Sequence, residues 1–266
     1  MPRNNRRGVL FACFALLSVL AACAPPPEVP PGTSVLRVET ESGPRMVLVQ
    51  VPDGPVKAVA VMFPGGDGRI GVSPDGSIGR IGNFLIRTRA QWVARGLMFA
   101  AVDAAPNRAG TRGDRVGPEN RRAIEAIVAT LRRRTTAPIW LLGTSAGAPA
   151  ALAGAASLPV GAVRGAVVSS PVSVAGPRDS VFDVALERVK APVLIQVHRD
   201  DGCAITPPDK AEPLKARLSG SRLVEIQTYE GGDSPRSGPC EAFSQHGFLG
   251  LERRVVDAAV DWILAH

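Results

Sequence analysis

Five residues, Gly143-Thr144-Ser145-Ala146-Gly147, restrict the folding of this chain more than any other part of its sequence. The apolar run 139–142 comes directly before them, and the small residues of 146–156 follow. A glycine on each side of the central Thr-Ser-Ala lets the chain turn sharply where a side chain would collide with a neighbouring element. Pro149 would fall in the first turn of a helix, where proline is tolerated. We therefore expect a buried strand, a tight turn that exposes Ser145, and a closely packed helix.

The chain alternates between strand-like and helix-like patterns from residue 56 to its end. Apolar runs typical of buried strands lie at 56–63, 97–102, 139–142, 163–169, 193–197 and 223–227. Helical patterns lie at 83–95, 118–134, 146–156, 209–218 and 249–264. This alternation predicts a mostly parallel sheet with helices on both faces. Two weakly alternating runs, 35–40 and 45–51, predict a β-hairpin ahead of it.

Length and composition favour a single folded domain. The 266 residues are 45% hydrophobic and 21% charged, as in an ordinary globular protein. Aromatic residues make up only 5%, which disfavours recognition of nucleic-acid bases by stacking. The basic residues of 108–134 are interleaved with acids, and no nucleic-acid-binding motif accompanies them. We interpret this segment as a solvated loop and helix face, and we expect no nucleic-acid partner.

Residues 1–22 are typical of an export signal. Arg3, Arg6 and Arg7 form a positive region, and an apolar run follows at 9–20. About a dozen apolar residues are too few to span a bilayer, which needs about 20. Removal of this segment lowers the net charge from +7 to +4, because it holds three arginines and no acid.

The end of this segment predicts a lipid anchor. Leu20-Ala21-Ala22-Cys23 resembles the bacterial lipobox, in which the cysteine is acylated and becomes the mature N-terminus. The alternative is an ordinary cleaved signal with an incidental cysteine. Residues 24–32 hold five prolines, so we interpret 23–32 as an extended tether and 33–266 as the folded domain. We expect an exported protein in a bacterial cell envelope, held on the periplasmic side of a membrane by Cys23.

Together, the motif around Ser145, the strand before it and the helix after it resemble the α/β-hydrolase superfamily. The motif has the form G-x-S-x-G, whose serine is the nucleophile in that family. The resemblance covers about residues 45–266. It implies an α/β-hydrolase fold and a catalytic triad in the chain order serine, acid, histidine. Relatives often have glycine where this chain has Arg199.

A serine nucleophile needs a base to take its proton, and only three histidines are available. His266 is the last residue, where we expect fraying, and His198 ends an apolar strand, where a structural role is favoured. His246 lies in a glycine-containing loop before the last helix, which is the usual place of the base in the family. We therefore predict His246 as the base.

The third member of the triad is an acid that orients the base. Asp200 and Asp201 both follow the strand 193–197. The resemblance favours Asp201, through an H-x-x-D spacing from His198, with Asp200 as its rival. Asp233 and Glu230 are weaker candidates.

An oxyanion hole needs two N–H donors beside the nucleophile. The resemblance assigns one to the backbone of Ala146 and the other to the loop Pro64-Gly65-Gly66-Asp67-Gly68. We choose Gly66, with Asp67 as the alternative. A plain glycine turn is the other interpretation of this loop. A phosphate loop is disfavoured, because no Gly-Lys-Ser/Thr follows.

Four cysteines divide into distinct roles. Cys13 leaves with the signal, and Cys23 would carry lipid, which leaves Cys203 and Cys240. An even pair in an oxidising compartment favours a disulfide over two free thiols. The bridge would join the loop of Asp201 to the loop of His246.

These residues predict a serine esterase that acts on a small-molecule acyl substrate, without metal or cofactor. Peptide hydrolysis and acyl transfer are alternatives on the same triad. A non-catalytic lipoprotein that uses the fold as a scaffold is also possible, but the complete triad argues against it. We expect the pocket walls to come from 66–82, 104–118 and 173–190, of which the last is too short for a closing lid. Arg108, Arg112 and Arg115 could favour an acidic substrate, but we interpret them as solvated.

Overall fold

The structure is a computed structural model that describes residues 1, 29–105, 114–174, 176–177 and 179–266. Most of the predicted signal peptide, Cys23 and the first part of the tether lie outside these residues, as do Arg108 and Arg112. Within the described part, no helix is both long enough and apolar enough to cross a membrane.

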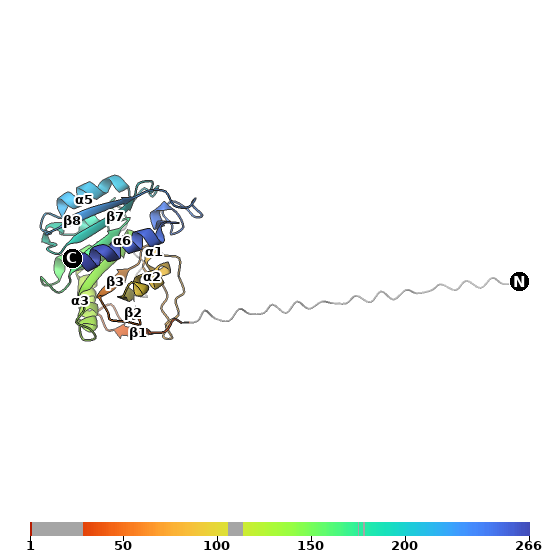
Figure 1. Cartoon of the computed structure of the whole chain (residues 1–266), viewed down its shortest axis with the longest axis horizontal. Helices are drawn as coiled ribbons and strands as arrows, with labels where there is room; N and C mark the ends of the chain where they lie inside the picture. Colours follow the sequence, from red (N-terminus) through yellow and green to blue (C-terminus); the bar gives the residue numbers. More distant parts are fainter. Residues whose placement is uncertain (2–28, 106–113, 175, 178) are drawn as a thin grey trace.

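One sheet of eight strands forms the centre of the molecule, in the order β1-β2-β4-β3-β5-β6-β7-β8 (Figure 1). β1 (Thr33–Val38) and β2 (Arg45–Gln50) form the predicted hairpin, and β2 also pairs antiparallel with β4. All other neighbours are parallel: β3 (Ala58–Phe63), β4 (Leu97–Val102), β5 (Ile139–Thr144), β6 (Gly165–Ser169), β7 (Val193–His198) and β8 (Val224–Tyr229). The predicted mostly parallel sheet is confirmed.

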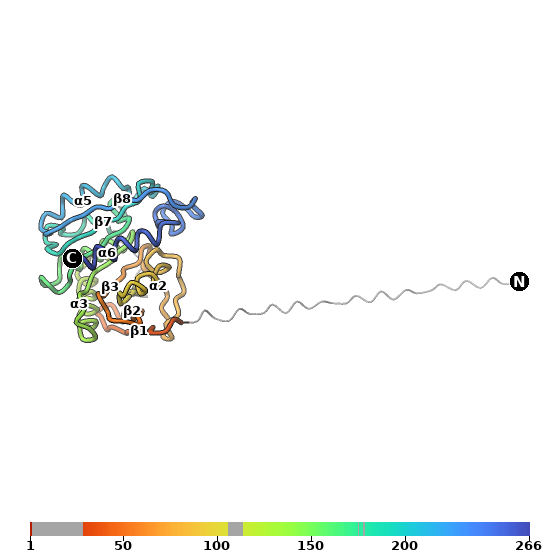
Figure 2. Tube along the Cα trace, viewed as in Figure 1, coloured from red at the N-terminus to blue at the C-terminus, as the bar shows by residue number. Residues whose placement is uncertain are grey.

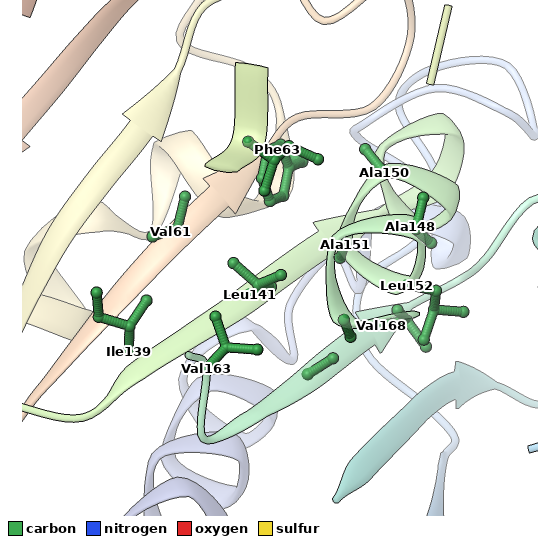
Figure 3. Close-up of a cluster of buried hydrophobic side chains, with 14 of the residues drawn as sticks. Val61, Phe63, Ile139, Leu141, Ala148, Ala150, Ala151, Leu152, Val163 and Val168 are labelled. Atoms are coloured by element: carbon green, nitrogen blue, oxygen red, sulfur yellow. The ribbon is translucent and has the colours of Figure 1, made fainter. Parts of the chain in front are cut away.

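Helices cover both faces of the sheet, and each face has its own apolar core. One core contains side chains of α3 (Pro118–Arg132), α4 (Ala148–Ser157) and α5 (Ala211–Arg217). Figure 3 shows part of this core, with Leu141 of β5 close to Ala151 of α4. The other core contains side chains of α1 (Phe84–Arg87), α2 (Arg89–Ala94) and α6 (Glu252–Ala265). The trace in Figure 2 shows α6 crossing the sheet toward the C-terminus.

The helix expected at 83–95 is in fact two short helices, and Thr88 explains the break. Thr88 has φ −92° and ψ 5°, outside the regular helical range. Its buried Oγ1 donates to the Phe84 carbonyl at 2.7 Å and accepts from Trp92 Nε1 at 2.9 Å. Such side-chain bonds to the backbone compete with a continuous helix.

The last helix starts later than expected, at Glu252 rather than 249. Phe248 and Gly250 have left-handed φ values of 58° and 79°, which a helix cannot include. The segment 173–190 has the short 3₁₀ turns Val181–Asp183 and Leu186–Arg188, which pack on α4.

Candidate active site

Ser145 lies on a strained turn between β5 and α4. Its φ is 53°, which a non-glycine residue rarely adopts. The flanking glycines make this turn possible. A Cβ on Gly147 would lie 1.9 Å from the carbonyl oxygen of Phe63, and one on Gly143 would lie 2.4 Å from that of Gly147. The turn therefore requires glycine on steric grounds at both positions, as the sequence predicts.

His246 is buried in the 3₁₀ turn Gln245–Gly247, just before α6. Its Nδ1 lies 2.9 Å from Asp201 Oδ2. Ser170 Oγ donates to the His246 carbonyl at 2.9 Å and holds the backbone of this turn. The side chains of His246 and Asp201 are 6% and 1% exposed, so water cannot easily compete for the hydrogen bond between them.

Asp201 has hydrogen-bond partners on both carboxylate oxygens. Oδ1 accepts from the Cys203 backbone at 2.9 Å, and Oδ2 accepts from Thr206 Oγ1 at 3.0 Å and faces His246. Asp200 is exposed and pairs with Arg199. The structure therefore brings Asp201, and not its neighbour, to His246.

The other two acids that the sequence offered also lie away from the histidine. Glu230 pairs with Arg199 on the surface. Asp233 is exposed, and neither acid has a hydrogen bond to His246 in the described part of the chain.

Ser145 and His246 line one cavity of about 520 Å³. One wall comes from the glycine-rich loop and the segment after it: Pro64, Gly65, Gly66, Asp67, Arg69, Ile70, Arg80, Gly82, Asn83 and Phe84. A second wall comes from the histidine loop: Cys240, Glu241, Ala242, His246 and Gly247. Among the described residues no hydrogen bond joins Ser145 Oγ to the His246 ring. Catalytic hydrogen bonds are often long before substrate binds.

Gly65 and Gly66 place the glycine-rich loop beside the nucleophile. A Cβ on Gly65 would lie 3.0 Å from the Ser145 Cβ, so this loop approaches as closely as glycine permits. Gly66 has a left-handed φ of 64°, and its backbone N–H has no acceptor among the described residues. Ala146 is buried in the first turn after Ser145. Both predicted donors thus adjoin the nucleophile.

A disulfide joins Cys203 to Cys240, as predicted, with their Cα atoms 4.6 Å apart. Cys203 follows Asp201 by two positions, and Cys240 lines the cavity six positions before His246. The bridge therefore links the acid loop to the histidine loop covalently.

Comparisons with solved structures identify this architecture. A cold-adapted esterase from an Arctic intertidal metagenomic library matches with a TM-score of 0.57 and 14% identity, over 87% of this chain and 92% of that one. A serine hydrolase of Xanthomonas campestris, described as lacking a lid, matches with a TM-score of 0.55 and 18% identity, over 88% and 98%. The chain has the α/β-hydrolase fold.

A third match is to a puromycin-hydrolysing peptidase of Mycobacterium tuberculosis, with a TM-score of 0.60 and 18% identity. The match covers 87% of this chain but only 39% of that longer protein. No protein-family model matches the sequence, and a search of curated proteins finds no relative.

The site occupies the carboxyl edge of the α/β-hydrolase sheet, where ligands bind in open parallel sheets. Of the expected walls, 66–82 lines the cavity, whereas no described residue of 104–118 or 173–190 does. The loop 240–247 forms the wall that sequence reasoning missed. Its cysteine and histidine were recognised, but nothing in the sequence indicated that the residues between them face the nucleophile.

Thr206 is a further part of the site that the sequence did not indicate. Its Oγ1 donates to Asp201 Oδ2 and lies 3.1 Å from His246 Nδ1. It is buried and touches both groups at once. A lone threonine in a loop carries no motif, so only the three-dimensional contact reveals it.

His198 has the structural role that the sequence favours. Its Nδ1 accepts from the Asp200 backbone at 3.0 Å, so Nε2 carries the proton and donates to the Gly231 carbonyl at 3.0 Å. His266, expected to fray, instead continues from α6: its Nδ1 contacts the Trp262 carbonyl, and its own backbone oxygen accepts from Arg164.

Proposed function

We propose that this protein is a serine hydrolase that cleaves acyl bonds of the ester type, with Ser145 as nucleophile. The observation that carries the proposal is the buried hydrogen bond between His246 and Asp201, beside the strained turn that presents Ser145 to the same cavity. A strained serine and a carboxylate-oriented histidine at one cavity form the arrangement that nucleophilic acyl transfer requires.

The reaction follows from the groups around the cavity. His246 Nε2 takes the Ser145 hydroxyl proton as Oγ attacks the acyl carbonyl. Asp201 holds the Nδ1 proton of the ring and stabilises the imidazolium. The N–H groups of Ala146 and Gly66 stabilise the oxyanion. His246 then gives its proton to the leaving alcohol, and water releases the acyl group from Ser145 by the same steps in reverse order.

Ester and amide cleavage share this chemistry, and the structural neighbours include both an esterase and a peptidase by name. We favour a small-molecule substrate, because the cavity is about 520 Å³, within the range of small-molecule pockets. A scaffold without catalysis would have no need for a strained serine, since such backbone costs about 1–3 kcal/mol unless it serves the site.

The test is covalent labelling with a fluorophosphonate, which reacts with activated serines. We expect the wild-type protein to be labelled on Ser145 and the Ser145→Ala variant to lose both label and ester turnover. Ser157→Ala is the matched control: Ser157 is the last residue of α4, the helix that follows the turn of Ser145, and in the described part of the chain its hydroxyl bonds to helix carbonyls. Retention of wild-type turnover by Ser145→Ala would refute the proposal.

We further propose that the protein is exported and anchored through an acyl group on Cys23. The signal-like segment 1–22 and the lipobox-like sequence support this, and a disulfide between Cys203 and Cys240 suits an oxidising compartment. Cys23→Ser should move the protein from the membrane fraction to the soluble periplasmic fraction. A variant that still sediments with membranes, together with a wild-type mass that lacks acyl chains, would remove the anchor.

A further inference from the structure

Two arginines and one aspartate form a linked group on the wall of the cavity. Asp67 Oδ2 accepts from Arg69 Nε at 3.1 Å, and both Asp67 oxygens accept from Arg80 Nη1 at 3.1 and 3.0 Å. All three residues line the cavity that holds Ser145. Asp67 directly follows Gly66, so this arginine pair is fixed to the glycine-rich loop itself.

The arginine pair keeps unused donors and an unbalanced charge. Two guanidinium groups share one carboxylate, so the group carries a net charge of about +1. Arg69 uses only Nε and Arg80 only Nη1, so within the described part of the chain Nη1 and Nη2 of Arg69, with Nε and Nη2 of Arg80, make no hydrogen bond. Their side chains are 43% and 64% exposed, so a ligand can reach these donors.

Asp67 is suited to holding the arginines in place over a wide pH range. Partial burial raises the pKa of Asp67, but the Arg69 backbone N–H and the Arg80 guanidinium outweigh it and leave the pKa below its ordinary value. The carboxylate therefore stays charged below its usual titration range. A positioned guanidinium loses less freedom when it binds an anion than a free one does.

A third cation lies against the same loop. Arg115 Nη2 donates to the carbonyls of Pro64 and Gly66 at 3.3 and 3.4 Å. A Cβ on Gly68 would lie 2.3 Å from this Nη2, so the guanidinium packs directly against the backbone of residue 68. Arg115 thus braces the backbone of the glycine-rich loop from outside the cavity lining.

Glu241, an acidic residue that also lines the cavity, belongs to the histidine loop. Its Oε2 accepts from the Gly238 backbone at 3.1 Å in the histidine loop. On the same wall as the arginines, Ile70 and Phe84 supply apolar lining. The cavity of Ser145 is therefore lined by both cationic donors and apolar residues.

We propose that Arg69 and Arg80 select acyl esters that carry a second, anionic group, a carboxylate separated from the scissile carbonyl by a short apolar chain. The inference rests on the proposed hydrolase function and names the substrate class of that site. The anion would form charge-assisted hydrogen bonds with the free guanidinium donors while the chain contacts Ile70 and Phe84. We expect this contact to form equally in the ground state and the transition state, so that it acts on binding more than on turnover.

The test compares two substrates of equal chain length: the mono(4-nitrophenyl) ester of adipic acid, which is anionic, and 4-nitrophenyl heptanoate, which is neutral. For the wild type we expect kcat/KM for the anionic ester to exceed that for the neutral ester by about tenfold, a value between those of an exposed ion pair and a charge-assisted bond. Arg69→Gln and Arg80→Gln should each reduce this ratio about threefold, mainly through KM, and the double variant should bring it close to one.

Two further variants separate recognition from general effects. Glu241→Gln should raise the ratio, because it removes a negative charge that opposes the substrate. Arg37→Gln is the matched control, since Arg37 lies on β1, pairs with Glu39 and is outside the cavity, and the change leaves the same net charge as Arg80→Gln. We expect wild-type kinetics from it on both substrates.

The outcomes are distinct. A purely structural role of the arginines would lower both rates by one factor and leave the ratio unchanged, which would overturn the assignment. A wild-type ratio of one or less would overturn the substrate class. Absence of both fluorophosphonate labelling and neutral-ester turnover in the wild type would instead refute the hydrolase proposal itself.

Discussion

Removal of the Cys203–Cys240 disulfide tests how the acid and histidine loops are held together. The two cysteines are 37 residues apart in sequence. In the chain-entropy model, a closed loop of that length stabilises the folded state by about 4 kcal/mol, because the bridge restricts the unfolded chain. Small domains have total unfolding free energies of about 5–15 kcal/mol. The bridge therefore accounts for a large part of the stability.

The assay is urea unfolding, followed by tryptophan fluorescence, since Trp92 and Trp140 are fully buried. Cys203→Ala, Cys240→Ala and the double variant should each lose about 4 kcal/mol, because any one change breaks the same bond and the losses do not add. The slope of the free energy against urea concentration should rise, because the unfolded chain becomes more expanded.

Activity should fall as well. Asp201 accepts a hydrogen bond from the Cys203 backbone, and a loosened loop would misplace His246 by amounts that can cost about 100-fold in rate. The reasoning would be refuted if the losses of unfolding free energy in the two single variants added up in the double variant. Losses of unfolding free energy below about 1 kcal/mol with unchanged kcat/KM would also refute it.

Two other changes test the residues around His246. Asp201→Asn should lower kcat by several orders of magnitude, because the amide would favour the wrong tautomer of His246. Asp200→Asn, the control, should change kcat less than about twofold. The reverse order in steady-state assays would assign the role of the acid to Asp200. Thr206→Val removes one hydrogen bond to the buried carboxylate and should lower stability by about 1–3 kcal/mol and kcat by about tenfold, with Thr206→Ser restoring most of both. Equal kinetics of the valine and serine variants would show that the hydroxyl does not orient Asp201.

The sequence alone determined the features that follow from short-range sterics and from patterns of burial. The alternation of apolar runs with helical patterns specifies the parallel sheet, because strands covered on both faces are mostly apolar. The glycines around Ser145 specify the sharp turn, since the sites of their missing Cβ atoms are already occupied by backbone. The cysteine pair was predictable because the number of cysteines and the expected compartment limit their partners.

Tertiary structure decided everything that depends on which loops meet. Asp200 and Asp201 are neighbours with the same chemistry, and only the direction of the chain after β7 turns one toward His246 and the other toward Arg199. Thr206, the second cavity wall and the arginine pair have no signature in the sequence, because their partners lie at distant positions or in unmarked loops. Thr88 interrupts a helical pattern through side-chain bonds to the Phe84 carbonyl and to Trp92, which the helical spacing does not predict. Local rules determine elements, whereas side-chain partners are set by the packing of those elements.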